Sequence, residues 1–98
     1  MYAVYFRRSH PVPNRMGEIL RRAEDEFFPH LQQSPGFVDF YLIQEEDGGS
    51  LSVILWESRE HAEVFQAKAG DWFRTLEQFA SLENQGRGRV VRHLTGTQ

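Results

Sequence analysis

Hydrophobic and polar positions divide the chain into short segments, of which residues 37–56 are the clearest. This segment reads FVDFYLIQEEDGGSLSVILW, two apolar runs joined by a turn that contains Asp47, Gly48 and Gly49. Adjacent glycines between two such runs indicate a β-hairpin, because tight hairpin turns need positive φ angles that glycine adopts without steric strain. The rest of the chain is expected to pack around this hairpin.

Two pairing registers of the hairpin are open. A turn on Gly48 and Gly49 gives apolar or aromatic cross-strand pairs throughout, namely Ile43–Ile54, Leu42–Leu55 and Tyr41–Trp56. A turn on Asp47 and Gly48 instead opposes Asp39 to Trp56 and Ile43 to Ser52. We favour the first register, since apolar cross-strand pairs stabilise antiparallel sheets.

Neither strand of the hairpin alternates cleanly between apolar and polar residues. In the favoured register, one face carries Phe37, Tyr41, Ile43, Ile54 and Trp56, and the other carries Val38, Phe40, Leu42, Leu51, Val53 and Leu55. Strands that are apolar on both sides are usually buried on both sides. Each face of the sheet therefore needs a cover, and the pattern does not say which face meets the helices.

The segment before the hairpin predicts a strand and a helix. Residues 2–7 are β-rich and aromatic, and residues 10–13 form a stiff loop because two prolines restrict the backbone. From residue 15 to 33, after a possible cap at Asn14, apolar residues recur at helical spacing: Met16, Leu20, Ala23, Phe27 and Leu31. Pro29 should kink or shorten this helix near Phe28.

The segment after the hairpin predicts a second helix and a last strand. Ser58 is a favourable N-cap, and Glu60 lies in the first turn, where the helix dipole favours an acid. The apolar stripe is Ala62, Phe65, Ala69, Phe73 and Leu76, with a break expected at Gly70. Residues 89–94, RVVRHL, are predicted as the fourth strand, and residues 95–98 as a loose tail.

The order β, α, β, β, α, β predicts an α+β ferredoxin-like sandwich, in which a four-stranded antiparallel sheet carries its helices on one face. The 98 residues are expected to form a single domain. Two helices cover only one face, and each large side chain left exposed on the other forgoes about 1.5–3 kcal/mol of burial. We therefore expect a homodimer that packs sheet against sheet.

Composition narrows the class of protein. The chain has 40% hydrophobic and 26% charged residues, a net charge of −3 and no cysteine. These values are typical of a globular protein; they argue against a general nucleic-acid binder and exclude disulfides and cysteine chemistry. Neither a secretory signal nor an apolar run long enough for a membrane helix is seen, so we expect a cytoplasmic protein.

Two stretches resemble a known family. Residues 34–40, SPGFVDF, and residues 56–65, WESREHAEVF, are similar to the antibiotic biosynthesis monooxygenase (ABM) domain family of dimeric α/β barrels. The resemblance implies two sheets that face each other across a dimer, with a ligand cavity between the sheet and the helices of each subunit. Its members include oxygenases of quinols or polyketide aromatics that need no cofactor, and haem-degrading enzymes.

The chain departs from this family at several functional positions. Many relatives carry a histidine on the second helix where this sequence has Phe65, and another a turn later, near Asp71 and Trp72. Haem-degrading relatives carry an asparagine, a tryptophan and a histidine ligand where this sequence has Arg7, Ala67 and Glu77. The resemblance therefore implies no haem, and we expect no cofactor.

Oxygenation without a cofactor needs a base, an apolar pocket and a flat surface for the substrate ring. His93 on the predicted last strand is the candidate catalytic base, although a histidine there commonly packs or meets solvent. The candidate substrate-binding residues are Tyr5, Arg7, Tyr41, Trp56, Phe65 and Trp72, of which the tryptophans equally suit the core and the tyrosines a dimer contact. No metal-ligand pattern is visible among the four scattered histidines.

Two functions follow from this pattern. The first is a monooxygenase of the quinol or antibiotic biosynthesis type that acts on a small aromatic substrate. The second is a dimeric module of the same fold that binds a small ligand or serves as a structural partner without catalysis. An open cavity lined by His93 and an arginine or tyrosine favours the enzyme. A pocket filled by Trp56, Trp72 and Phe65 favours the module.

Overall fold

The computed structural model describes residues 1–10 and 15–96. Its elements, in chain order, are β1 (Tyr2–Ser9), α1 (Met16–Glu26), α2 (Phe28–Gln33), β2 (Phe37–Gln44), β3 (Ser50–Trp56), α3 (Arg59–Lys68), α4 (Gly70–Leu76) and β4 (Ser81–Arg89). The predicted βαββαβ order is confirmed, with each expected helix divided into two pieces.

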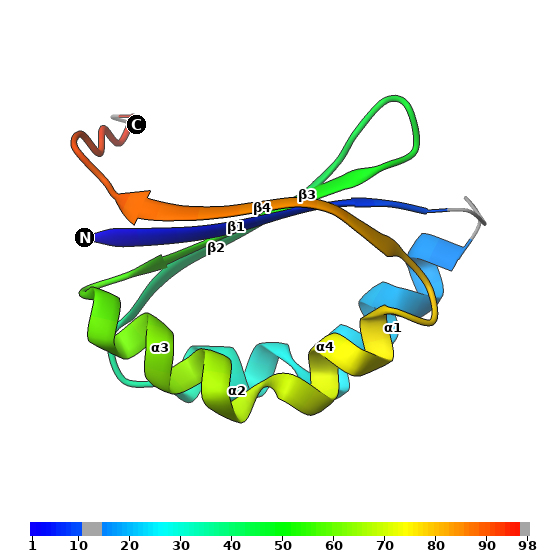
Figure 1. Ribbon diagram of the computed structural model, residues 1–98, viewed down its shortest axis with the longest axis horizontal. Helices are drawn as coiled ribbons and strands as arrows, with labels where there is room; N and C mark the ends of the chain where they lie inside the picture. Colours follow the sequence, from blue (N-terminus) through cyan, green and yellow to red (C-terminus); the bar gives the residue numbers. More distant parts are fainter. Residues whose placement is uncertain (11–14, 97–98) are drawn as a thin grey trace.

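The four strands form one antiparallel sheet in the order β2-β3-β1-β4. All four helices lie on one side of this sheet, and the opposite side is left without a helical cover (Figure 1). We call these sides the helix face and the open face. This arrangement confirms the ferredoxin-like fold class.

The helix breaks follow from local chemistry. Helix α1 ends at its C-cap, Phe27, and Pro29 lies in the first turn of α2. Backbone N–H groups in the first turn have no intrahelical acceptor, so the N–H that proline lacks costs no hydrogen bond there. The second predicted helix is interrupted at Ala69, immediately before Gly70. Ser58 caps α3 because its hydroxyl oxygen accepts a hydrogen bond from the backbone N–H of His61. The expected cap at Asn14 lies outside the described residues.

The core lies between the helix face and the helices. Trp56 and Leu31 are its most deeply buried large side chains. Around them pack apolar residues from β1, β3, α1 and α3, namely Val4, Phe6, Ala23, Ile54, Ala62 and Phe65, together with Phe27 from the α1–α2 junction. Both predicted helical stripes contribute to the core, although α1 buries Ile19 together with Ala23 and leaves Leu20 only partly buried.

The hairpin register differs from both predictions. Ile43 pairs with Leu51, whereas the favoured register predicted Ile54 and the alternative register predicted Ser52. The loop has three residues, because Glu45 N–H donates to Gly49 O at 2.8 Å and Gly48 N–H donates to Glu45 O at 3.0 Å. Gly48 takes the positive φ, 95°, that such a loop needs after its tight turn.

This shift also corrects the predicted faces of the hairpin. An odd-numbered slip of register moves every side chain of one strand to the other face. The helix face carries Phe40, Leu42, Ile54 and Trp56, and the open face carries Tyr41, Ile43, Leu51, Val53 and Leu55. Only one face of the hairpin therefore packs against the helices.

The fourth strand lies at a different place from the predicted one. Strand β4 ends at Arg89, the residue at which the predicted strand begins. Its sequence, SLENQGRGR, has no apolar alternation because β4 is an edge strand with mostly exposed residues. The pairing continues only as far as Val90, whose N–H donates to Met1 O at 2.9 Å. The prediction of a strand over residues 89–94 was wrong, and His93 lies beyond the sheet.

Candidate functional site

A small cavity of about 50 Å³ lies between the helix face and the helices. Its walls are mainly aromatic, formed by Phe6, Phe27, Phe28, Phe40, Trp72 and Phe73. The apolar lining also includes Met16 and Ile19 near the start of α1 and Leu76 at the end of α4. Such walls suit a flat apolar ring.

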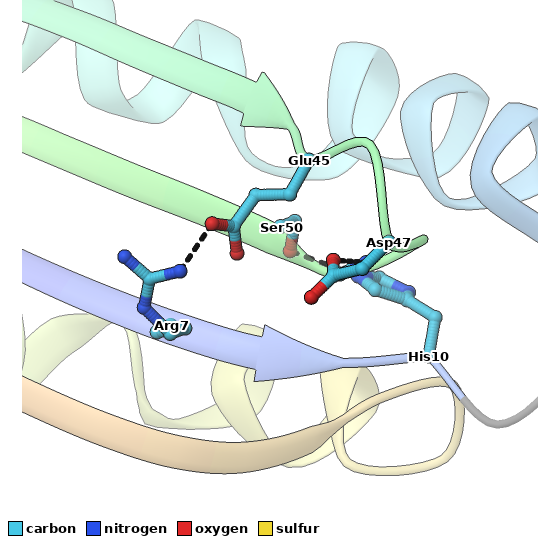
Figure 2. A network of polar contacts seen from close by, with 6 residues as sticks. Arg7, His10, Glu45, Asp47 and Ser50 are labelled. Carbon is cyan, nitrogen blue, oxygen red and sulfur yellow. Dashed lines mark hydrogen bonds and ion pairs between the residues drawn. The ribbon is translucent and has the colours of Figure 1, made fainter.

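Four polar residues lie at one part of this cavity: Arg8, His10, Ser50 and Ser52. The alternation of β1 places Val4, Phe6 and Arg8 on the helix face, and Arg8 is directly opposite Ser50 on β3. His10 follows the end of β1, and its Nε2 lies 2.8 Å from the Ser50 hydroxyl (Figure 2). Register and strand alternation thus bring these residues together without any local sequence motif.

The surroundings of His10 favour its neutral form. Burial lowers the pKa of His10 below its ordinary value of 6.5, and the positive charge of Arg8 lowers that pKa further. Its Nδ1 is buried and has no hydrogen-bond partner among the described residues. When Nε2 donates its proton to Ser50, Nδ1 keeps a free lone pair. His10 can then accept a proton or a hydrogen bond.

Arg8 places a cation against the aromatic wall. Its guanidinium carbon lies 5.0 Å from the centre of the Phe6 ring and 6.0 Å from that of Phe73. Burial lowers the pKa of Arg8, whereas the negative charge of Glu77 acts in the opposite direction. An arginine stays charged at neutral pH despite such a shift, so the cavity contains a positive charge.

The wall formed by Phe27 and Trp72 separates two spaces. Their rings stack with centroids 5.2 Å apart and planes inclined by 10°. The same two residues also line a cleft of about 410 Å³, rimmed by Glu26, His30 and Lys68. Because both spaces share this wall, a rotation of Trp72 would extend the cavity toward the cleft.

Of the predicted site residues, Trp72 lies on the cavity. Trp56 is only 1% exposed and packs in the core against Phe65, with ring centroids 5.1 Å apart. Tyr5 and Tyr41 lie on the open face and are 41% and 51% exposed. The sequence therefore indicated one wall of the cavity but placed the other aromatic candidates in the core or on the outer surface.

Arg7 and His93 also lie away from the cavity. Arg7 points to the open face and forms an ion pair with Glu45, in front of the sheet in Figure 2. His93 follows the sheet, and its Nε2 lies 3.7 Å from Asp39 Oδ2 on β2. These contacts give both residues partners on the open side of the sheet.

Arg8 and His10 were missed, although a signal for them exists. Alternate positions of a strand share one face, so the series that contains Val4 and Phe6, continued outward, places Arg8 and His10 on the same side. Ser50 could not be found in this way, because its side depends on the hairpin register.

Two searches of the described part of the chain were negative. Within residues 1–10 and 15–96, no group of three histidine, aspartate or glutamate side chains is placed to hold a metal ion. Over the same residues, no helix is both long and apolar enough to cross a bilayer.

No protein-family model and no curated protein matches the sequence. The fold matches solved structures, among them SnoaB, a cofactor-independent oxygenase from Streptomyces nogalater, with 18% identity and a TM-score of 0.75 over 97% of both chains. A monooxygenase from the gene ActVA-Orf6 of Streptomyces coelicolor, solved with nanaomycin D, gives a TM-score of 0.79 at 14% identity, covering 98% of this chain and 92% of that one.

A third match is a dimeric ferredoxin-like protein from an uncultured marine organism. It has 15% identity and a TM-score of 0.74, covering 98% of this chain and all of that chain. At such identities the matches show a shared ferredoxin-like α+β fold and nothing further. The resemblance stated from the sequence is confirmed at this level.

Proposed function

We propose that the protein is a cofactor-independent monooxygenase that acts on a small aromatic substrate of the quinol or anthrone type. The observation that carries the proposal is the position of His10 at the polar part of an aromatic cavity, with a buried Nδ1 that has no partner among the described residues. Burial and Arg8 lower its pKa, which favours the neutral form that a base needs. The fold shared with two oxygenases supports the same class of reaction.

The proposed chemistry begins with proton transfer. His10 Nδ1 accepts a proton from the substrate, and Ser50 holds the imidazole through Nε2. The substrate anion gives an electron to dioxygen, and the resulting radicals join through a new carbon–oxygen bond. Loss of water from the peroxide then leaves a carbonyl group, so anthrone and one O₂ yield anthraquinone and one H₂O. The imidazolium returns its proton to the departing hydroxide.

The apolar walls assist this step by excluding water from the anion. At about 50 Å³ the cavity holds little more than one or two water molecules, so a substrate ring must displace side chains. Trp72 and Met16 are the residues on the lining best suited to move, since Trp72 faces an adjoining cleft and methionine has three rotatable bonds.

We also propose that two copies of the chain pack through their open faces. Tyr5, Tyr41 and Ile43 are exposed there, and one solved structure of this fold is a dimeric protein. Leu55 of this face is buried and His93 reaches Asp39 there, but the exposed aromatic and aliphatic side chains have no helical cover, which is typical of an interface. In this arrangement Tyr5, Arg7 and Tyr41 serve assembly, and the cavity of each subunit stays on the opposite side of its sheet.

The small cavity supports a second candidate function, a dimeric binding module without catalysis. In that case a ligand enters, but no oxygen is consumed. Both functions predict quenching of tryptophan fluorescence by an aromatic ligand, since Trp72 lines the cavity. Only the oxygenase predicts protein-dependent turnover.

Oxygen uptake with anthrone and a series of hydroquinones tests the proposal. We expect uptake by the unmutated protein and a loss of about 100-fold or more in His10→Gln, the usual range for removing a general base. His93→Gln is the matched comparison, because its histidine lies outside the cavity. Uptake lost in His93→Gln but kept in His10→Gln would assign the base to His93. No uptake above background would favour the binding module.

A further inference from the structure

The charge of Arg8 has no counterpart in the cavity. Among the described residues, Glu77 is the carboxylate whose charge acts on Arg8, but neither it nor another carboxylate forms an ion pair with this guanidinium, and no side chain accepts a hydrogen bond from it. Residues 11–14 and 97–98, which the structure does not describe, read PVPN and TQ and contain no aspartate or glutamate. Five other arginines each contact a carboxylate, namely Arg7, Arg15, Arg22, Arg59 and Arg74. The remaining arginines also form no ion pair among the described residues, but unlike Arg8 they are exposed to solvent: Arg21, Arg87, Arg89 and Arg92.

An unpaired cation beside aromatic rings is unusual enough to need a reason. Contact with the Phe6 and Phe73 rings offsets part of the lost hydration of Arg8, but rings accept no strong hydrogen bond. The guanidinium keeps up to five N–H donors, which match the two oxygens of a carboxylate. The Ser50 and Ser52 hydroxyls line the same cavity and can donate to the same anion.

We propose that Arg8 is an anion anchor and that the cavity takes an aromatic carboxylic acid. The carboxylate pairs with the Arg8 guanidinium, and the ring lies against the wall formed by Phe27, Trp72 and Phe73. This proposal rests on the proposed function in that it uses the same cavity and defines its substrate class. It also assigns separate roles to the two polar side chains, because Arg8 binds the acid group and His10 faces the reacting part of the ring.

The arrangement also explains why the acid does not disable His10. A carboxylate alone would stabilise the protonated imidazole, whereas a carboxylate paired with Arg8 is largely neutralised. The anchored acid therefore leaves His10 able to accept a proton near neutral pH. A neutral ring of the same size would find the same walls but no partner for the cation.

The test compares 2-naphthoate with 2-naphthamide, a neutral ligand of nearly the same shape. Binding is measured by quenching of tryptophan fluorescence and by calorimetry in the full-length protein. We expect the unmutated protein to bind the acid about tenfold or more tightly than the amide, the usual effect of a charge-assisted hydrogen bond. In Arg8→Met the acid and the amide should bind with about equal affinity, whereas Arg8→Lys should keep part of the preference for the acid.

Arg59→Met is the matched control, because Arg59 lies on the exposed surface of α3 and pairs with Glu63. The control should keep the full preference for the acid. Equal affinity for acid and amide in the unmutated protein, no binding of either ligand, or a preference that survives in Arg8→Met would each overturn the proposal. Circular dichroism checks that each variant folds. If Arg8→Met does not fold, the acid-to-amide ratio in the unmutated protein and in Arg8→Lys decides.

Failure of the anchor and failure of the proposed function give different results. Acid-selective binding without oxygen uptake would keep the anchor and remove the oxygenase. Oxygen uptake from neutral hydroquinones, with no preference for naphthoate over naphthamide, would keep the oxygenase and remove the anchor.

Discussion

Arg7 and Arg8 are neighbours in the sequence but lie on opposite faces of the same sheet. Arg7 forms an ion pair with Glu45 on the open face, next to exposed tyrosines and Ile43. Arg8 faces an aromatic cavity and has no carboxylate partner among the described residues. A difference of one position on β1 therefore separates an arginine that pairs with a carboxylate on the surface from one that we propose to bind an anionic ligand.

The same contrast holds for the two faces as a whole. Side chains on the helix face meet the helices of their own chain, so their packing is complete within one subunit. The open face has aromatic and branched residues but no helical cover, so in the proposed dimer its packing depends on a second subunit. Our proposals thus place ligand binding and assembly on different sides of one sheet.

The largest expected effect concerns the open face. Ile43→Lys should weaken a dimer by about 100-fold or more, because a lysine charge would be buried between apolar surfaces. Val64→Lys is the matched control, since Val64 is exposed on α3, on the other side of the molecule. Light scattering over a dilution series measures the change. A monomer in the unmutated protein at every concentration would contradict the assignment of this face to assembly.

A smaller effect is expected from the partnered arginine. Arg7→Met should lower the free energy of unfolding by about 1 kcal/mol or less, because an ion pair that is still partly open to solvent contributes little. It should also leave the preference for 2-naphthoate unchanged, in contrast to Arg8→Met. Urea denaturation and the same fluorescence titration provide the two measurements. A loss of acid preference in Arg7→Met would show that the two faces are not separate.

The smallest effect is the pH dependence contributed by His10. Burial and Arg8 lower the pKa of His10 in the folded protein, so below about pH 6.5 the unfolded chain binds a proton that the folded chain does not. Stability should therefore fall as the pH decreases from about 7.5 to about 5.5, and His10→Gln should reduce this slope. Denaturation midpoints across this range measure it. An unchanged slope in His10→Gln would mean that the imidazole is not held neutral.

Most of the fold could be predicted from the sequence because it depends on strong local signals. The helical stripes, Pro29 and Gly70 located the helices and their breaks, and Ser58 marked the start of α3. The hairpin register was missed because two adjacent glycines suggest a two-residue turn, whereas Gly48 alone takes the positive φ and Gly49 begins the return.

The last strand and the site were harder to predict. Strand β4 is a polar edge strand, so hydrophobic periodicity pointed instead to the apolar residues that follow it, and His93 was placed on a strand that does not exist. Arg8 and His10 carry no motif, and their role depends on which face of β1 the helices cover. Which face of β1 the helices cover is determined by the packing of the whole chain.

The two edges of the sheet also differ in how they limit aggregation. Strand β4 is polar and contains two glycines, so it offers little to an intermolecular strand. Strand β2 is apolar, and its protection rests on the irregular pairing between Phe37 and Asp39 and on the charge of Asp39 itself. We therefore expect aggregation at high concentration to depend mainly on β2. One carboxylate and one irregularity limit intermolecular strand pairing along this otherwise apolar edge.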